Sequence, residues 1–187
     1  MRKLIQFLLL LLVLQGCKKE SPKKLQDIVN NPKIPDEVIF IEVAKKIFKN
    51  QFKELKFESK DNKKVVYIDY GGNSALTFRQ STDYVKEHMK ITAKYALKYF
   101  QILKNRKLET LVLSIVKPLY VKEEEINKEV IEEFEIFRVR IEFEELEKIP
   151  EWEKIDTEDP NFEDVYMEKI IQKWKVELNE FKRIELK

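Results

Sequence analysis

Cysteine and histidine, two side chains that often do chemistry in proteins, occur once each in this sequence, as Cys17 and His88. A thiol can act as a nucleophile or a metal ligand, and an imidazole can transfer protons or bind a metal. Zinc sites use three or four such ligands, and here no second histidine or cysteine is available. Cys17 directly follows an apolar run, with Gly16 before it and two lysines after it. Cys17 thus lies at the boundary between an apolar segment and a lysine-rich one, without partners for a metal site.

The residues that lead to Cys17 have the order of an export signal. A basic start and an apolar run over residues 4–14 end in Leu14-Gln15-Gly16-Cys17. This ending resembles the lipobox of bacterial lipoproteins, Leu-x-Gly/Ala-Cys. The resemblance implies that the Cys17 sulfur receives a diacylglycerol through a thioether bond. It also implies that residues 1–16 are a signal peptide, which a dedicated peptidase removes so that Cys17 becomes the first residue.

An alternative for the same segment is an uncleaved N-terminal anchor helix that carries an incidental cysteine. The apolar run is too short for a membrane span, which needs about 20 residues, and it suits the apolar part of a signal peptide. We therefore expect a palmitate-carrying lipoprotein of the cell membrane or outer membrane, with its domain outside the cytoplasm and the bilayer as a partner through acylated Cys17. The lysines after Cys17 favour sorting to the outer membrane if the cell has two membranes.

The charge of the mature chain is balanced. Without residues 1–16 the sequence keeps 34 basic and 34 acidic residues, so its side-chain charge is zero. A nucleic-acid-binding protein usually has a strong basic excess, and we expect no nucleic-acid partner. The 171 mature residues are enough for one domain with a substantial core.

One residue and two segments could also take part in chemistry, and each has a simpler structural interpretation. His88 lies on the apolar stripe of a predicted helix and is expected to be a partly buried, hydrogen-bonded residue of the core. Residues 71–74, Gly-Gly-Asn-Ser, lack the glycine spacing of a phosphate-binding loop and are expected to form a turn. Residues 156–164 contain five carboxylates, but they lack the mid-loop glycine of a calcium-binding loop. The sequence therefore predicts no catalytic residue, no metal site and no cofactor.

The elements that position these residues follow from side-chain periodicity. Residues 17–34 are expected to be a lipidated cysteine and a flexible tether, and residues 35–187 a single domain. Helical spacing predicts a helix from Pro35 and a long helix to about Lys104. Strand-like alternation predicts a hairpin over residues 55–70, a strand from Leu111, a strand over residues 134–145 and a C-terminal strand from Trp174; a short helix is expected after Pro160.

The order of these elements predicts an α+β fold, in which an antiparallel β-sheet packs against one long α-helix, with shorter helices near both ends of the domain. Phe137, Val139, Ile141 and Phe143 are expected to share the buried face of one strand. The residues between them are expected on the solvated face. That solvated row is Arg138, Arg140, Glu142 and Glu144. Pro118 of the preceding strand is expected either to end the regular pairing of that strand or to mark an edge.

Two functions from different classes fit this sequence. The main hypothesis is a non-catalytic binding or structural module of the cell envelope, which recognises an unknown envelope protein or ligand. The alternative is a small exported enzyme, hydrolase-like, that uses aspartates or glutamates exposed by no motif. A pocket in which two carboxylates with perturbed pKa values converge would favour the enzyme.

Overall fold

The computed structural model describes residues 22–61, 63–73, 82–123 and 128–182. These residues form an α+β fold around one five-stranded sheet, and the strands follow one another in the sheet in their order along the chain. The strands are β1 (Phe52–Lys60), β2 (Lys63–Tyr70), β3 (Thr110–Glu123), β4 (Lys128–Glu142) and β5 (Trp174–Asn179). The prediction of an α+β fold is confirmed.

The sheet is mixed. Three of its four strand pairs are antiparallel, whereas β2 and β3 run parallel, with Val65 opposite Thr110 and Tyr70 opposite Ile115. A parallel pair needs a long crossover, which here contains the 22-residue helix α4 (Thr82–Leu103). The expected antiparallel sheet is wrong at this pair, because side-chain alternation reports which face is buried and not the direction of the neighbouring strand.

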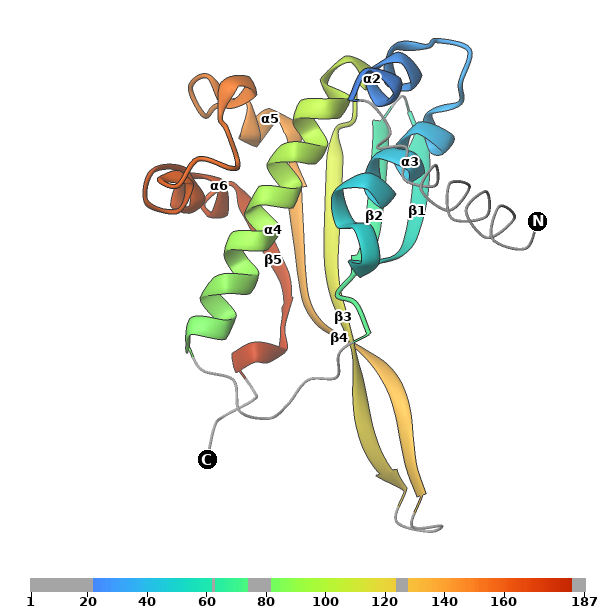
Figure 1. The fold of residues 1–187 in the computed structure, drawn as a ribbon, viewed down its shortest axis with the longest axis vertical. Helices are drawn as coiled ribbons and strands as arrows, with labels where there is room; N and C mark the ends of the chain where they lie inside the picture. Colours follow the sequence, from blue (N-terminus) through green and yellow to red (C-terminus); the bar gives the residue numbers. More distant parts are fainter. Residues whose placement is uncertain (1–21, 62, 74–81, 124–127, 183–187) are drawn as a thin grey trace, which may run out of the picture.

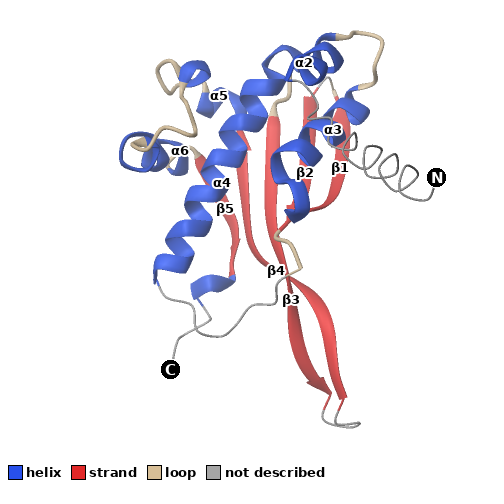
Figure 2. Ribbon diagram, in the orientation of Figure 1, coloured by secondary structure: helices blue, strands red, loops and turns tan. Residues whose placement is uncertain are grey.

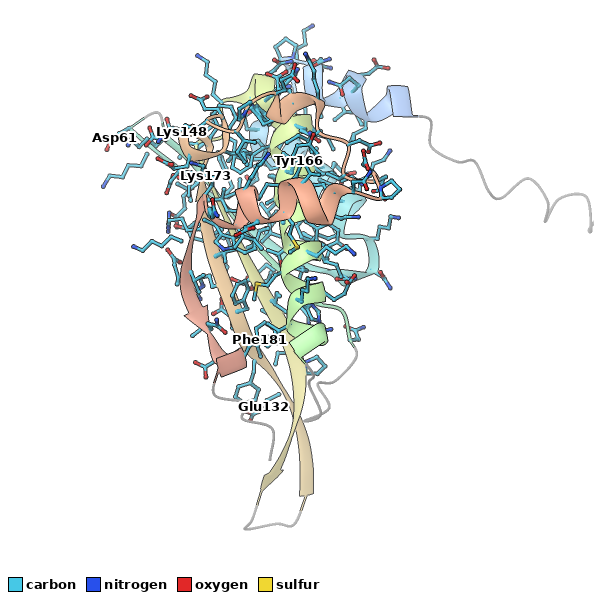
Figure 3. The ribbon with its side chains drawn as sticks, turned by 90° about the vertical axis from the view of Figure 1, so that its left-hand side faces the viewer. Asp61, Glu132, Lys148, Tyr166, Lys173 and Phe181 are labelled. Carbon is cyan, nitrogen blue, oxygen red and sulfur yellow. The ribbon has the colours of Figure 1, made fainter. Side chains whose placement is uncertain are left out.

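The helices lie on one side of the sheet (Figures 2 and 3). Helix α4 and helix α3 (Asp36–Phe48) lie over the strands, and α2 (Pro22–Asn30) lies at the end of the molecule where α4 finishes (Figure 1). Two short helices, α5 (Phe143–Leu146) and α6 (Glu168–Ile171), flank the β5 side of the sheet. The long helix therefore covers the sheet together with α3 and not alone.

Alternation along the strands determines the core. The helix-facing residues of the three central strands are almost completely buried, namely Val66, Ile68, Tyr70, Leu111, Leu113, Ile115, Phe137, Val139 and Ile141. Arg138, Arg140 and Glu142 lie one step away and are partly exposed, as the sequence predicts. The strand ends at Glu142, however, because Phe143 starts α5 and packs its ring 5.4 Å from that of Trp152. Glu144 is therefore on α5 and not in the solvated row of β4.

Helix α2 differs from the expected tether. From Pro22 to Asn30 the chain is helical, Val29 is completely buried, and Leu25 and Ile28 pack against the core. The side chain of Arg106 donates hydrogen bonds from Nε to the carbonyl oxygen of Val29 at 2.6 Å and from a terminal nitrogen to that of Asn31 at 2.7 Å. The part of the predicted tether from Pro22 onward is therefore packed on the domain. Cys17 itself lies outside the described residues.

Strands β3 and β4 continue beyond the rest of the sheet as a two-stranded arm (Figure 1). The pairing of β2 with β3 stops at Ile115, whereas that of β3 with β4 continues to Glu123 opposite Lys128. Pro118 lies in this arm, where β4 is the one strand that pairs with β3 among the described residues. A proline has no N–H to donate to a second neighbour, so the alternative that Pro118 marks an edge is confirmed. The other alternative is wrong, because Pro118 is paired with Glu133 and the pairing continues beyond it.

Candidate functional site

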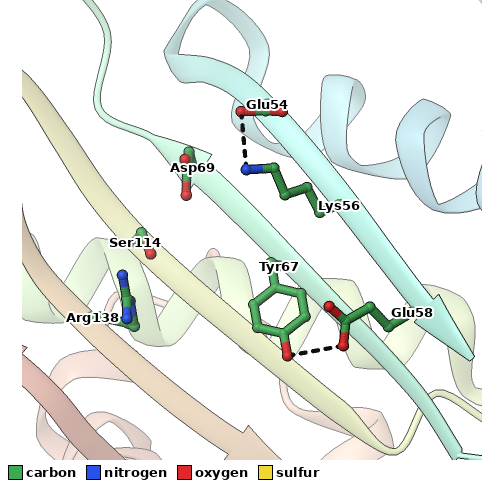
Figure 4. A pocket seen from close by; sticks show the side chains of 7 residues that line it. All are labelled: Glu54, Lys56, Glu58, Tyr67, Asp69, Ser114 and Arg138. Carbon is green, nitrogen blue, oxygen red and sulfur yellow. Dashed lines mark hydrogen bonds and ion pairs between the residues drawn. The ribbon is translucent and has the colours of Figure 1, made fainter. Parts of the chain in front are cut away.

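The face of the sheet opposite α3 and α4 is open and carries charged residues from four strands. Strand register places Glu54, Asp69, Ser114 and Arg138 in one row across β1 to β4. Lys56 and Tyr67 follow in the next row, and Glu58 lies one further pair along β1. These seven residues line a hollow of about 330 Å³ (Figure 4). The hollow is large enough for a polar side chain or a small ligand.

A β-bulge brings one more carboxylate to the edge of this hollow. The pairing of β3 with β4 passes from Ile115–Phe137 to Val116–Glu135, so that Ile136 is the extra residue. Glu135 and Arg138 are three positions apart and would point to opposite faces of a regular strand. With the bulge they meet, and Arg138 donates from Nε to Glu135 Oε1 at 2.7 Å and from a terminal nitrogen to the other carboxylate oxygen.

Asp69 lies in the row that forms the middle of the hollow, and its pKa is raised above the ordinary value of 3.8. The main cause is burial, and the negative charges of Glu135 and Glu54 add to it. Lys56 and a hydrogen bond with Ser114 act in the opposite direction. The negative charge of Asp69 is therefore unfavourable at this position, and a positive group brought into the hollow would stabilise it.

The other charges of the hollow have partners within it. Lys56 Nζ lies 3.8 Å from a carboxylate oxygen of Glu54, and the Tyr67 hydroxyl donates to Glu58 at 3.4 Å (Figure 4). The pKa of Arg138 is raised above its ordinary value, first by its hydrogen bond to Glu135. Arg138 is therefore a fixed cation, and the ion pairs leave Asp69 and Glu58 as carboxylates whose hydrogen-bond donors are hydroxyl groups.

The predicted row on β4 continues beside the hollow as an ion-pair network. Arg140 donates from Nε to Glu177 of β5 at 2.7 Å, and Glu142 lies 3.9 Å from Arg140. Thr110 donates a hydrogen bond to Glu142. Arg138, Arg140 and Glu142 are thus together on the open face, as the sequence predicts. The charges in this part of the face are paired with one another. A charged partner would therefore interact most strongly with the hollow.

A second hollow, of about 440 Å³, lies near the start of the arm and contains His88. Burial, followed by the positive charge of Lys117, lowers the pKa of His88 to about 4. The ring is partly buried and stacks on that of Phe181, with the ring centres 6.2 Å apart. The expected partial burial of His88 beside the core is confirmed, whereas the hydrogen bond expected for its side chain stays a prediction.

The Gly71-Gly72 segment lines the same hollow and continues irregularly from the end of β2, with a positive φ at both glycines. The N–H groups of both glycines donate to the carbonyl oxygen of Gln51, at 2.9 and 3.4 Å. A Cβ at Gly71 would collide with the carbonyl oxygen of Val116 on β3. Gly71 is therefore required by a close approach of two backbone segments, and its N–H group is already used. Ser74 lies outside the described residues.

The acidic segment 156–164 forms turns. Asp156 accepts a hydrogen bond from the backbone N–H of Glu158 at 2.9 Å, and Asp159 accepts one from that of Asn161 at 2.7 Å. Glu158 forms an ion pair with Lys98 of α4. Across the described ranges, no group of three or more histidine, cysteine, aspartate or glutamate residues has the geometry to hold a metal ion.

Comparison with protein-family models, curated proteins and solved structures gave no match for this chain. In the part of the chain that the structure describes, no helix has the length and apolar character needed to cross a membrane. Sequence reasoning did not single out Asp69, Glu54 or Tyr67. The only signal for Tyr67 and Asp69 was their position between inward-facing residues of the predicted hairpin, and Glu54 lies just before that hairpin.

Proposed function

We propose that this protein is a lipid-anchored lipoprotein of the bacterial cell envelope, whose domain binds a partner on the open face of its sheet. The anchor is supported by the lipobox-like residues that end at Cys17. The binding role is supported by one observation above all, the half-buried Asp69 beside Glu54 and Glu135 in the hollow. A carboxylate held in such surroundings reduces stability, and residues of this kind gather at functional sites.

The chemistry of the hollow favours a partner that presents a cationic group. Glu54 and Glu135 already have Lys56 and Arg138 as ion-pair partners, whereas the hydrogen bonds to Asp69 and Glu58 come from hydroxyl groups. A lysine or arginine side chain of an envelope protein would relieve the repulsion around Asp69 and form a charge-assisted hydrogen bond. The domain would then act as a binding module with no reaction of its own.

A photo-crosslinking residue tests this proposal in intact cells. It is placed at position 56 in the hollow and, as a control, at Lys46, an exposed position on α3. We expect specific crosslinked products from position 56 only, and weaker ones when Asp69→Asn is added, because Asn carries no charge for a cationic partner. The same products from both positions, or a yield that does not respond to Asp69→Asn, would contradict binding at the hollow.

The anchor has its own test. Cys17→Ser removes the thiol that forms the thioether, so we expect the variant to lose both labelling by a palmitate analogue and removal of residues 1–16. Equal labelling of the variant and the wild type would refute the lipoprotein assignment.

A small exported hydrolase is the second candidate, and the raised pKa of Asp69 is the observation that favours it. A carboxyl group with a raised pKa beside a second carboxylate, here Glu54, is a common arrangement for general acid–base catalysis. The purified protein can be assayed on peptide, ester and glycoside substrates. Activity that Asp69→Asn and Glu54→Gln both abolish would favour the enzyme over the binding module.

A further inference from the structure

The end of the domain that carries α2 is basic. Three segments meet there around a hollow of about 440 Å³: the connection from α2 to α3, the start of β2 and the turn after α4. Asp36 is the one acidic residue among those that line this hollow, and it forms ion pairs with both Lys64, at 2.6 Å, and Arg106, at 3.3 Å. The single negative charge is therefore already neutralised by two positive ones.

Three more lysines at this end are exposed: Lys33, Lys63 and Lys107. Within the described ranges, none of the three has a carboxylate close enough for an ion pair. Helix α5, which carries two glutamates, lies on the other side of the end of α4 from α2 (Figure 1). The surface around the hollow thus presents an excess of positive charge to anything that approaches it.

The opposite end of the long axis is the arm, and its sequence is acidic (Figure 1). The described residues 22–37, 60–61, 63–64 and 104–109 at the α2 end contain nine basic and five acidic residues, whereas residues 116–123 and 128–135 of the arm contain three basic and five acidic residues. A chain whose mature charge is zero is therefore polarised along its length. A negatively charged surface would attract the α2 end and repel the arm.

The chain also limits how far this end can be from a lipid anchor. Five residue steps separate Cys17 from Pro22, where α2 begins. An extended chain gains at most about 3.6 Å per residue, so α2 starts within about 18 Å of the Cys17 backbone. We propose that the α2 end of the domain rests on the anionic phospholipid headgroups of the bilayer, with the arm pointing away from the membrane. This inference builds on the proposed lipid anchor at Cys17.

Binding of the unlipidated chain to vesicles tests membrane docking of the α2 end separately from the lipid anchor. The protein used is residues 17–187 with Cys17→Ser, which contains every described residue. The probes are vesicles of phosphatidylglycerol with phosphatidylcholine, and vesicles of phosphatidylcholine alone. Each basic residue near an anionic surface strengthens binding by roughly fivefold at low salt. We expect binding to the anionic vesicles only, and Lys33→Gln, Lys63→Gln and Lys107→Gln together to weaken it by at least about tenfold.

A matched triple variant controls for net charge. It replaces Lys46, Lys49 and Lys175 with glutamine, three exposed lysines away from the α2 end. Lys49 and Lys107 both have a positive φ, of 52° and 54°. Both variants lose the same charge, and we expect the control to bind within about twofold of the parent chain. An equal loss of vesicle binding in the two variants, or equal binding of the parent chain to both kinds of vesicle, would refute docking through the α2 end.

Orientation is measured with single cysteines, since the Cys17→Ser chain has none of its own. A fluorophore at Asn105→Cys, beside the basic hollow, should transfer energy to an acceptor on the lipid headgroups. The same fluorophore at Glu132→Cys, an exposed position on the arm, should transfer much less. Equal transfer from both positions would refute the orientation. Absence of palmitate labelling in cells would instead refute the anchor and leave the vesicle result unaffected.

Discussion

Replacing Gly71 by alanine should destabilise the domain strongly, and the structure gives two reasons. Gly71 has a φ of +147°, a conformation available almost only to glycine, and holding another residue there costs on the order of 1–3 kcal/mol. The new methyl group would also collide with the carbonyl oxygen of Val116, a backbone atom that can yield only if β3 shifts. Overpacking of this kind typically costs about 1–3 kcal/mol.

The two effects together predict a loss of roughly 2–6 kcal/mol, against a total stability of about 5–15 kcal/mol for an ordinary domain. Urea unfolding followed by tryptophan fluorescence and circular dichroism measures the loss. The control is Gly72→Ala, where φ is +69° and the nearest atom to a Cβ is Gln51 Cγ at 3.8 Å. Only backbone strain applies there, and the expected loss is about 1 kcal/mol. Losses within about 0.5 kcal/mol of each other would refute the close approach to Val116.

Three further predictions concern the core and the two hollows. Val139→Asp should cost several kcal/mol by placing an unpaired charge in the core, whereas Val176→Asp, directly opposite on β5 and 46% exposed, should cost less than about 1 kcal/mol in parallel urea melts. The pKa of His88 falls from 6.5 to about 4 on folding, so the contribution of the neutral His88 side chain to stability is complete above pH 6.5 and is lost as the pH falls towards 4. Between pH 7 and pH 5, the urea midpoint of the wild type should therefore drop more than that of His88→Gln. The raised pKa of Asp69 means that its charged form opposes folding, so Asp69→Asn should raise the melting temperature at pH 7, and a lower melting temperature would contradict a strained carboxylate.

Periodicity in the sequence was enough to predict most of the individual elements. The β1–β2 hairpin, helix α4 and the buried row Phe137, Val139 and Ile141 all match the structure, because each has a local pattern of apolar side chains. Helix α2 was missed for a non-local reason. Its lysine-rich sequence resembles a tether, and what packs it on the domain includes hydrogen bonds from Arg106, 77 residues away from Val29.

The hollow on the open face depends on features that no local pattern carries. Asp69 and Ser114 become neighbours only because β2 and β3 pair in parallel, and Glu135 reaches Arg138 only because Ile136 is the extra residue of a bulge. Strand direction and bulge position are set by packing between distant segments. The charged row on β4 could therefore be predicted, whereas its partners on β1 and β2 could not.

The parallel pairing of β2 with β3 also has a consequence for how the chain folds. The β1–β2 and β3–β4 hairpins each join strands that are close in sequence, so each can form early and by itself. Joining them brings Tyr70 and Thr110 to adjacent strands across a segment that includes the whole of α4. Closing a loop of about 40 residues costs roughly 3 kcal/mol of chain entropy, which is regained only when α4 packs on both hairpins. Docking of α4 is therefore expected to be the rate-limiting step of folding, with the hairpins forming before it.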